Sequence, residues 1–209
     1  MAVRVSHDKC LVSDVAEHIA RAASRLFAAK GYDATPVRTI VEAAGVTKPT
    51  LYYHFKSKEG LAQALVTEPL ARLVEALREN AERPGDPVER VERALETQFA
   101  FCREDPDRAR FVYALLFGPL GSGLAAELAR FGEDIDRMMV ASVRPLAAAG
   151  VVAEGRVEDC ASACRGMIVI STMDFLYAGK DLGPGLARRL VGELLHGFAS
   201  AEVSGAVQG

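Results

Sequence analysis

Two short helical patterns separated by a glycine constrain the fold of this chain more than any other feature. The first begins at Thr35, a good helix cap, and carries an apolar face at helical spacing until Gly45 ends it. Thr47 is placed to cap the second pattern, whose inward face consists of two residues four positions apart, Leu51 and Phe55. The sequence therefore predicts a helix-turn-helix between residues 35 and 55.

Helical periodicity continues on both sides of this unit. Asp14 and Glu17 fit a capping box and Gly31 fits a helix stop, so a first helix is expected over residues 14–30. Ser57 is placed to cap a fourth helix over residues 58–82. Breakers rich in Gly and Pro then separate further segments of helical length. We expect these helices over residues 88–103, 108–117, 124–149, 156–178 and 186–201.

Since strand patterns are scarce, the segments together predict an all-α protein. We expect an N-terminal three-helix domain containing the helix-turn-helix over residues 1–57, followed by a larger helical domain over residues 58–201. Residues 202–209 are expected to form a disordered tail.

The charge distribution suits an N-terminal domain that faces an anionic partner. Residues 1–60 hold 9 Lys or Arg against 6 Asp or Glu, whereas the remaining 149 residues hold 16 against 22. A net charge of -3 thus hides a basic start and an acidic remainder. Such a small excess is also common in domains that bind no polyanion, so charge alone does not decide the function.

The sequence predicts a protein of the cytoplasm. Charged and polar side chains already occur within its first nine residues, so the start lacks the apolar stretch of a secretory signal. The longest uncharged run, residues 111–126, is interrupted by glycines and a proline and is too short for a membrane span. Four scattered cysteines do not form a disulfide framework, so reduced thiols are expected.

The second helix of the predicted helix-turn-helix has the layout of a DNA-reading helix. In such units this helix enters the major groove with its N-terminal residues nearest the bases. Here those residues are Thr47, Lys48 and Thr50. Threonine offers a hydroxyl and a methyl group to base edges, and lysine suits guanine or phosphate.

Residues further along this helix are candidates for phosphate contacts. With Leu51 and Phe55 inward, a step of about 100° per residue points Tyr53 outward and puts Tyr52 and His54 on the flanks. The tyrosine hydroxyls, Lys56 and Lys58 would hold phosphates, which set position and affinity rather than sequence preference.

Each of these residues also has an ordinary structural explanation. A tyrosine pair on a helix usually packs in a core or an interface, a histidine there is usually structural, and the two lysines alone describe a solvated face. The same spacing also occurs in αα-corners that bind no DNA. The combination of a capped short helix, a glycine turn, and hydroxyl and cationic side chains at the helix start favours the DNA-reading interpretation.

The stretch AASRLFAAKGYDATPVRTIVEAAGVTKPTLYYHFKSKEGLAQAL, residues 22–65, resembles the N-terminal DNA-binding domain of the tetracycline-repressor (TetR) family of transcriptional regulators. The segments LFAAKGYDAT, IVEAAGV and TLYYHFKSKEGL follow the family's order without gaps, over about the first third of the chain. The resemblance implies a homodimer whose two recognition helices enter successive major grooves of a palindromic operator. By matching position, the expected DNA-binding residues are Arg38, Thr39, Thr47, Lys48, Thr50, Tyr52, Tyr53, His54 and Lys56.

The same resemblance implies that the C-terminal helices bind a small-molecule effector and that the last two pair with their copies in a four-helix dimer interface. Here those two are residues 156–178 and 186–201, whose apolar patterns fit an interface or an interior equally well. Aromatic and methionine side chains in the middle helices indicate a mainly apolar effector, although core packing explains them too. The candidates for lining its pocket are Phe99, Phe101, Phe111, Tyr113, Phe117, Met138 and Met139.

Cys160 and Cys164 lie four residues apart on one predicted helix face. Two thiols are too few for a closed metal site without help from histidine or carboxylate, and His196 is the only nearby histidine candidate. Buried structural cysteines are the better account, so we expect neither a metal nor a cofactor.

The sequence carries no nucleophile elbow, zinc-protease pattern or P-loop. The stretch GPLGSGL has the outer glycines of a P-loop, but Leu124 and Ala125 stand where Lys and Ser or Thr are needed. We therefore expect a regulator that is not an enzyme, namely a repressor released from its operator by a small effector. The alternatives are an activator, a helical interaction protein, and a small-molecule-binding protein or enzyme with a non-functional helix-turn-helix.

Overall fold

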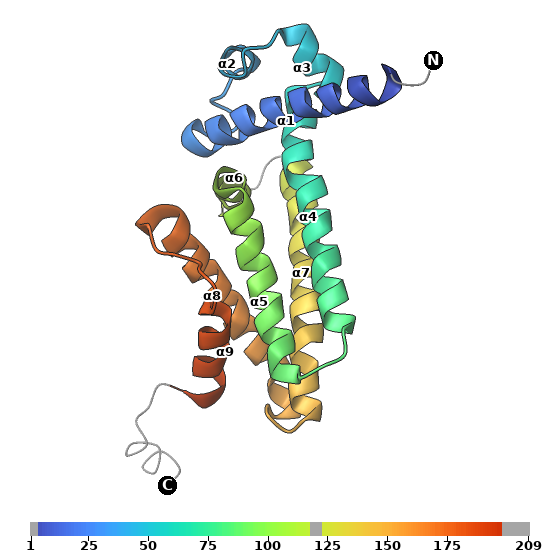
Figure 1. The fold of residues 1–209 in the computed structure, drawn as a ribbon. Helices are drawn as coiled ribbons and strands as arrows, with labels where there is room; N and C mark the ends of the chain where they lie inside the picture. Colours follow the sequence, from blue (N-terminus) through green and yellow to red (C-terminus); the bar gives the residue numbers. More distant parts are fainter. Residues whose placement is uncertain (1–3, 118–122, 198–209) are drawn as a thin grey trace. The chain divides into compact units, whose positions relative to one another are not determined.

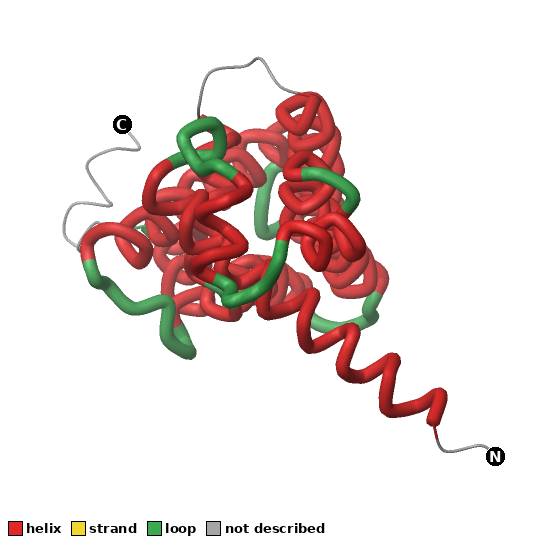
Figure 2. Tube along the Cα trace, turned by 90° about the horizontal axis from the view of Figure 1, so that it is seen from above, coloured by secondary structure: helices red, strands yellow, loops and turns green. Residues whose placement is uncertain are grey.

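The computed structural model describes residues 4–117 and 123–197, and every regular element in these two ranges is a helix (Figure 1, Figure 2). The predicted all-α class is therefore confirmed. The predicted disordered tail, residues 202–209, lies outside the described residues. In chain order the helices are α1 (Arg4–Lys30), α2 (Val37–Ala43), α3 (Lys48–Phe55), α4 (Lys58–Glu82), α5 (Pro87–Glu104), α6 (Pro106–Phe117), α7 (Gly123–Ala148), the short 3₁₀ helix η1 (Glu154–Arg156), α8 (Val157–Ala178) and α9 (Leu186–His196).

The chain divides into two compact units. The first consists of Met1–Arg72 and Glu104–Gly132, and the second of Leu73–Arg103 and Glu133–Gly209. The first unit holds α1 to α3, most of α4, and α6; the second holds α5, α8, α9 and the larger part of α7. The division into functional domains at residue 57 stays a prediction.

In the first unit, α1 packs against α2, α3 and α6 (Figure 1). The apolar stripe of α1 that helical spacing predicts faces this core, because a helix must bury its hydrophobic face against another element. Fully buried residues from three helices form the centre of this core: Ile19, Ala23, Phe27, Ile40 and Leu51.

Two predicted helix starts in this unit are wrong. Asp14 and Glu17 do not begin a helix, since α1 runs without interruption from Arg4 through both residues to Lys30. Thr35 does not cap α2, because the N-cap residue is Pro36 and makes no side-chain cap. The Thr35 hydroxyl instead donates to the carbonyl oxygen of Gly31 at 2.7 Å, and the residue is fully buried. Thr35 therefore closes the end of α1 rather than opening α2.

Other predicted boundaries agree closely with the structure. The fourth helix has the predicted bounds, and the Ser57 hydroxyl caps it by accepting the backbone N–H of Gly60 at 3.0 Å. The starts of α5 to α8 and the ends of α5 and α7 differ from prediction by one or two residues, and the ends of α6 and α8 are as predicted. The last helix ends at His196, where Gly197 with φ of 76° forms the C-cap, instead of continuing to residue 201. Residues 198–201 lie outside the described residues.

In the second unit, arginine side chains donate hydrogen bonds to carbonyl oxygens at helix ends and in a connection between helices. Arg90 donates to the carbonyl oxygens of Ala81 and Arg83 at 2.6 and 3.0 Å, which satisfies the C-terminus of α4. Arg103 donates to the carbonyl oxygen of Leu182, a fully buried residue of the α8–α9 connection. None of the helices in the described part of the chain is long and apolar enough to cross a bilayer.

Candidate DNA-binding interface

The turn into α3 is built from local hydrogen bonds. Gly45, with φ of 61°, occupies the left-handed region that favours glycine, and it turns the chain after α2. Thr47 has extended backbone angles, and its Oγ1 accepts the Thr50 backbone N–H at 3.3 Å, so the predicted cap is confirmed. The Thr47 and Thr50 hydroxyls lie 2.8 Å apart. The start of α3 is therefore held in place before any partner binds.

The first turn of α3 faces solvent. Thr47, Lys48 and Pro49 are exposed and Thr50 is half-buried. A helix N-terminus carries backbone N–H groups without intrahelical partners and a partial positive charge. Together with the Lys48 ammonium and the threonine hydroxyls, this turn offers hydrogen-bond donors and positive charge to an anionic partner.

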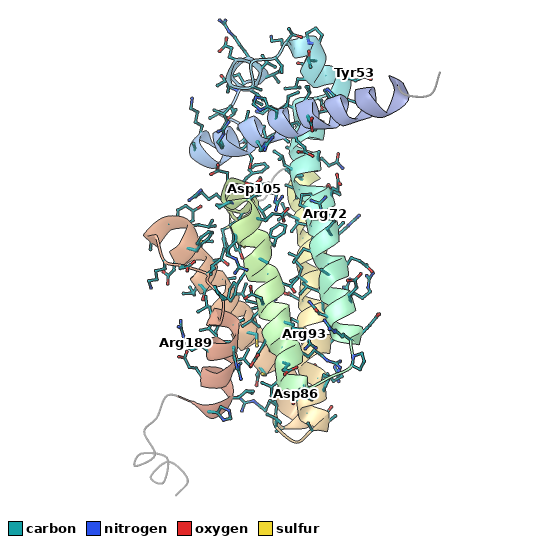
Figure 3. All side chains as sticks on the ribbon, in the orientation of Figure 1. Tyr53, Arg72, Asp86, Arg93, Asp105 and Arg189 are labelled. Carbon is teal, nitrogen blue, oxygen red and sulfur yellow. The ribbon has the colours of Figure 1, made fainter. Side chains whose placement is uncertain are left out.

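The remainder of α3 is oriented as predicted. Leu51 is fully buried, while Tyr52 and Tyr53 are 42% and 68% exposed. Figure 3 labels Tyr53, and its ring contacts that of His54 edge-on with centroids 5.1 Å apart. His54 and Phe55 are half-buried. One buried line along α3 thus leaves both tyrosine hydroxyls on the outer surface.

Arg38 and Thr39 lie near the start of α2. The exposed Arg38 donates from Nε to Glu42 Oε1 at 2.7 Å, one helical turn away, and this hydrogen bond and the carboxylate charge raise the pKa of Arg38 further. Thr39 is half-buried. The guanidinium group is thereby oriented along α2, and a DNA phosphate at this position must compete with the Glu42 carboxylate.

Both lysines that follow α3 have partners within the chain. Lys56 Nζ donates to the carbonyl oxygen of Tyr53 at 3.2 Å and lies 6.0 Å from the centroid of the Tyr53 ring. Lys58 Nζ lies 4.2 Å from the centroid of the Tyr32 ring, which is cation–π geometry. Lys56 therefore supplies a hydrogen-bond donor at the C-terminus of α3, and Lys58 contributes to the packing that supports the interface.

That support includes an aromatic cluster that sequence reasoning missed, formed by Phe27, Tyr32 and Phe111. The ring of Phe111 on α6 lies with its centroid 4.9 Å from that of Phe27 and 6.4 Å from that of Tyr32. Phe27 and Tyr32 meet edge-on at 5.2 Å. Tyr32 follows the predicted helix stop at Gly31, so its position near the end of α1 was visible in the sequence, although its partners were not.

Tyr32 also contacts the start of α4. Burial raises the pKa of Tyr32 to about 12, and the charge of Glu59 and a hydrogen bond to its carboxylate act in the same direction. The pKa of Glu59 is lowered, first by a hydrogen bond from its own backbone N–H and then by one from Ser57. The aromatic cluster therefore joins α1 and α6, and Tyr32 extends this connection to the start of α4.

The predicted effector residues are divided between the two units. Phe111 is buried in the aromatic cluster, and Tyr113 stacks on the exposed Phe117 with ring centroids 6.0 Å apart, all in the first unit. The other four belong to the second unit, where Phe99 and Met139 are buried and Phe101 and Met138 half-buried. Met139 alone among them lines a cavity of about 130 Å³ between α7 and α8. Their effector role stays a prediction.

The two cysteines of α8 have the environment expected of structural thiols. Cys164 is buried and Cys160 half-buried. Burial raises the pKa of both thiols, that of Cys164 to about 12, which disfavours the reactive thiolate. Within the described ranges, no group of three or more His, Cys, Asp or Glu side chains comes together as a metal site would require.

Comparisons with known proteins agree with this geometry. Residues 19–65 match the sequence profile of the family described as "Bacterial regulatory proteins, tetR family". YdgC of Bacillus subtilis, an uncharacterised helix-turn-helix transcriptional regulator, is 29% identical over 187 residues that cover 87% of this chain and 91% of the relative.

Solved structures of similar fold extend the likeness beyond the matched domain. The TetR-family regulator PfmR from Thermus thermophilus is 25% identical with a TM-score of 0.72, covering 87% of this chain and 99% of that one. FadR from Bacillus subtilis, solved in complex with stearoyl-CoA, is 19% identical with a TM-score of 0.68, covering 88% and 99%.

The capped, exposed start of α3 and the all-helical fold define a DNA-binding transcriptional regulator of the helix-turn-helix class. Over residues 19–65 the chain carries the sequence pattern of the TetR family of bacterial regulatory proteins, and its fold is similar to that of a TetR-family regulator over most of its length.

Proposed function

We propose that this protein is a repressor that binds a palindromic operator as a homodimer and leaves it when a small, mainly apolar effector binds. The observation that carries the proposal is the first turn of α3, which is capped by Thr47, exposed, and rich in hydrogen-bond donors. Bases are read by Thr47, Lys48 and Thr50, while Arg38, Tyr52 and the remaining predicted residues hold phosphates. The function includes no catalysis, and it places the protein with the chromosome in the cytoplasm.

The exposed surface of α8 supports the homodimer. Ile170 and Tyr177 are 63% and 64% exposed, and the small residues Ala163 and Gly166 on the same helix are exposed as well. Their separations of three, four and seven residues put them along one side of the helix. Large apolar side chains exposed beside small ones allow close packing of a second helix, and a second copy of α8 is the partner that this proposal assigns.

The effector is expected to carry a long apolar part. The similar FadR structure was solved with stearoyl-CoA, and the aromatic and methionine candidates of the middle helices suit an acyl chain. A shift of α6 on effector binding would reach α1 through Phe111, because that ring packs on Phe27 and Tyr32. A coupling free energy of about 1–3 kcal/mol between the two sites corresponds to roughly 5–150-fold weaker DNA binding.

Selection of bound fragments from a random DNA pool, followed by sequencing, tests the DNA-binding part of the proposal. We expect a palindrome whose half-sites lie about 34 Å apart, one helical turn of DNA. Binding to this operator should fall by about three to five orders of magnitude between 50 and 200 mM salt if 6–10 phosphates are neutralised. Binding that shows no sequence preference, or that does not respond to salt, contradicts the proposal.

Two variants test whether the start of α3 supplies the side chains that read the bases. Lys48→Ala combined with Thr50→Ala should reduce the preference for the operator over random DNA, because these side chains are proposed to contact base edges. Arg130→Ala is the control, since it removes an exposed cation from α7. The assignment fails if the control variant loses as much sequence preference as the α3 variant.

A further inference from the structure

The first unit contains a large groove that the DNA-binding function does not use. Its walls are α1, α4 and the start of α6, and its volume is about 1000 Å³. Four arginines line it, together with acidic residues from α1, α4, the end of α5 and the start of α6. Figure 3 labels one residue on each of two walls, Arg72 on α4 and Asp105 before α6.

Most of the acidic groups in the groove already have a partner. Arg72 donates to Glu68 at 3.2 Å, and Arg108, which is almost fully buried, donates to Glu104 at 3.2 Å. The Asp105 carboxylate accepts the backbone N–H of Arg108 at 2.9 Å and so closes the start of α6. A further carboxylate of the groove is paired with an arginine outside it, at 2.8 Å: Asp107 with Arg110.

The other two arginines that line the groove belong to α1. Arg21 and Arg25 lie four residues apart, so they share one side of the helix, and both are exposed. Neither forms an ion pair with any residue whose side chain the structure describes. Like charges at this spacing repel each other, and an anion bound between them would remove that repulsion. The neighbouring Glu17 carboxylate carries one negative charge, which is less than the combined positive charge of the two guanidinium groups.

We propose that this groove binds a small molecule that carries phosphate groups, held by Arg21 and Arg25. A guanidinium group presents a planar fork of N–H donors that matches phosphate oxygens, and two forks on consecutive helical turns suit a diphosphate or two neighbouring phosphates. The volume matches an organic phosphate of drug-like size rather than a single inorganic ion. The site is separate from α3 and does not depend on the operator.

Occupancy of this groove has a structural consequence for the DNA-binding helices. Since α1 packs against α2, α3 and α6, an anion that bridges α1 to the other walls stabilises one arrangement of α1 relative to α6. The bound anion is therefore expected to change operator affinity by the same factor by which operator binding changes anion affinity.

Isothermal titration calorimetry of the full-length protein tests the site, with sodium pyrophosphate and coenzyme A as probes at constant ionic strength. We expect saturable binding to the wild type that becomes about tenfold weaker or more when Arg21→Gln and Arg25→Gln are combined, because charge-assisted bonds to phosphate are lost. The matched control combines Arg83→Gln and Arg130→Gln, which removes the same charge from two exposed arginines outside the groove. Arg72 and Arg108 are left intact because they are paired within the protein.

The probes and variants separate the outcomes. Binding of both probes identifies phosphate as the recognised group, and binding of coenzyme A alone identifies an organic phosphate; both results support the site. An equal loss in the control variant, or no binding of either probe, overturns it. So does a loss of operator binding in the α1 variant with unchanged anion binding, which would make these arginines contacts to the DNA backbone. Operator binding by the wild type, measured on the same preparation, reports the proposed repressor function separately.

Discussion

The contact between Phe111 and Phe27 permits a quantitative test of how α6 is joined to α1. Both rings are almost fully buried, with centroids 4.9 Å apart and an angle of 38° between their planes. Replacing either residue by leucine retains most of the apolar volume. Apart from the energy of the ring contact, each single variant should therefore lose less than about 1.5 kcal/mol in free energy of unfolding. A favourable aromatic pair contributes about 0.5–1.5 kcal/mol in addition to its buried area.

A double-mutant cycle isolates this pairwise contribution. Phe27→Leu, Phe111→Leu and the double variant are unfolded in urea at one fixed protein concentration, because dimerisation would make the apparent free energy of unfolding depend on concentration. The expected interaction energy is about 0.5–1.5 kcal/mol. A second cycle with Tyr32→Leu in place of Phe27→Leu should give a smaller value, since those centroids lie 6.4 Å apart.

The result that would refute this reasoning is additivity within about 0.3 kcal/mol in the Phe27–Phe111 cycle, because that is the behaviour of independent sites. Operator affinity of the same variants then asks whether the contact matters for function. If the cycle shows coupling but operator binding and its response to effector are unchanged in Phe111→Leu, the cluster stabilises the first unit without transmitting a signal.

Four further predictions address single residues. Thr47→Ala should cost about 0.5–2 kcal/mol in the free energy of unfolding, measured in urea, since it removes the α3 cap; an unchanged free energy would mean that the cap contributes nothing. Lys56→Gly should have a higher melting temperature than Lys56→Ala, because φ at this position is 66°, in the left-handed region that favours glycine. Both variants should reduce the salt slope of operator binding by about one if the lysine contacts a phosphate. The folded-state pKa of Tyr32 is raised to about 12 from 10.0, so its stabilising contribution should be complete below pH 10 and lost as the pH rises toward 12; the difference in stability between wild type and Tyr32→Phe should shrink over that window, and a constant difference contradicts the assignment. Cys160 and Cys164 should react with a thiol reagent at pH 7 only after unfolding, because burial raises both thiol pKa values; rapid labelling of the native protein would disprove this.

Features that depend on a few neighbouring residues could be read from the sequence. The Thr47 cap, the turn at Gly45 and the start of α4 after Ser57 were predicted correctly, because each rests on hydrogen bonds or backbone angles within four residues. The outward direction of Tyr53 followed from the helical period once Leu51 was taken as buried, and the structure agrees.

Features that require distant segments to meet were decided by the tertiary structure. Thr35 has the chemistry of a cap, but its burial against the end of α1 gives its hydroxyl a carbonyl partner there. The local signal at Asp14 did not stop α1 from beginning ten residues earlier, because a capping box permits a helix start and does not impose one.

Phe111 shows the same limit for the candidate sites. Helical spacing identifies it as apolar and inward, which fits a pocket wall as well as a core, and only the packing of α6 on α1 assigns it to Phe27 and Tyr32. The groove lined by Arg21 and Arg25 likewise needs three helices that are distant in sequence. Hydrogen bonds within one or two turns are encoded locally, whereas burial and the proximity of side chains from different helices arise only when the elements pack.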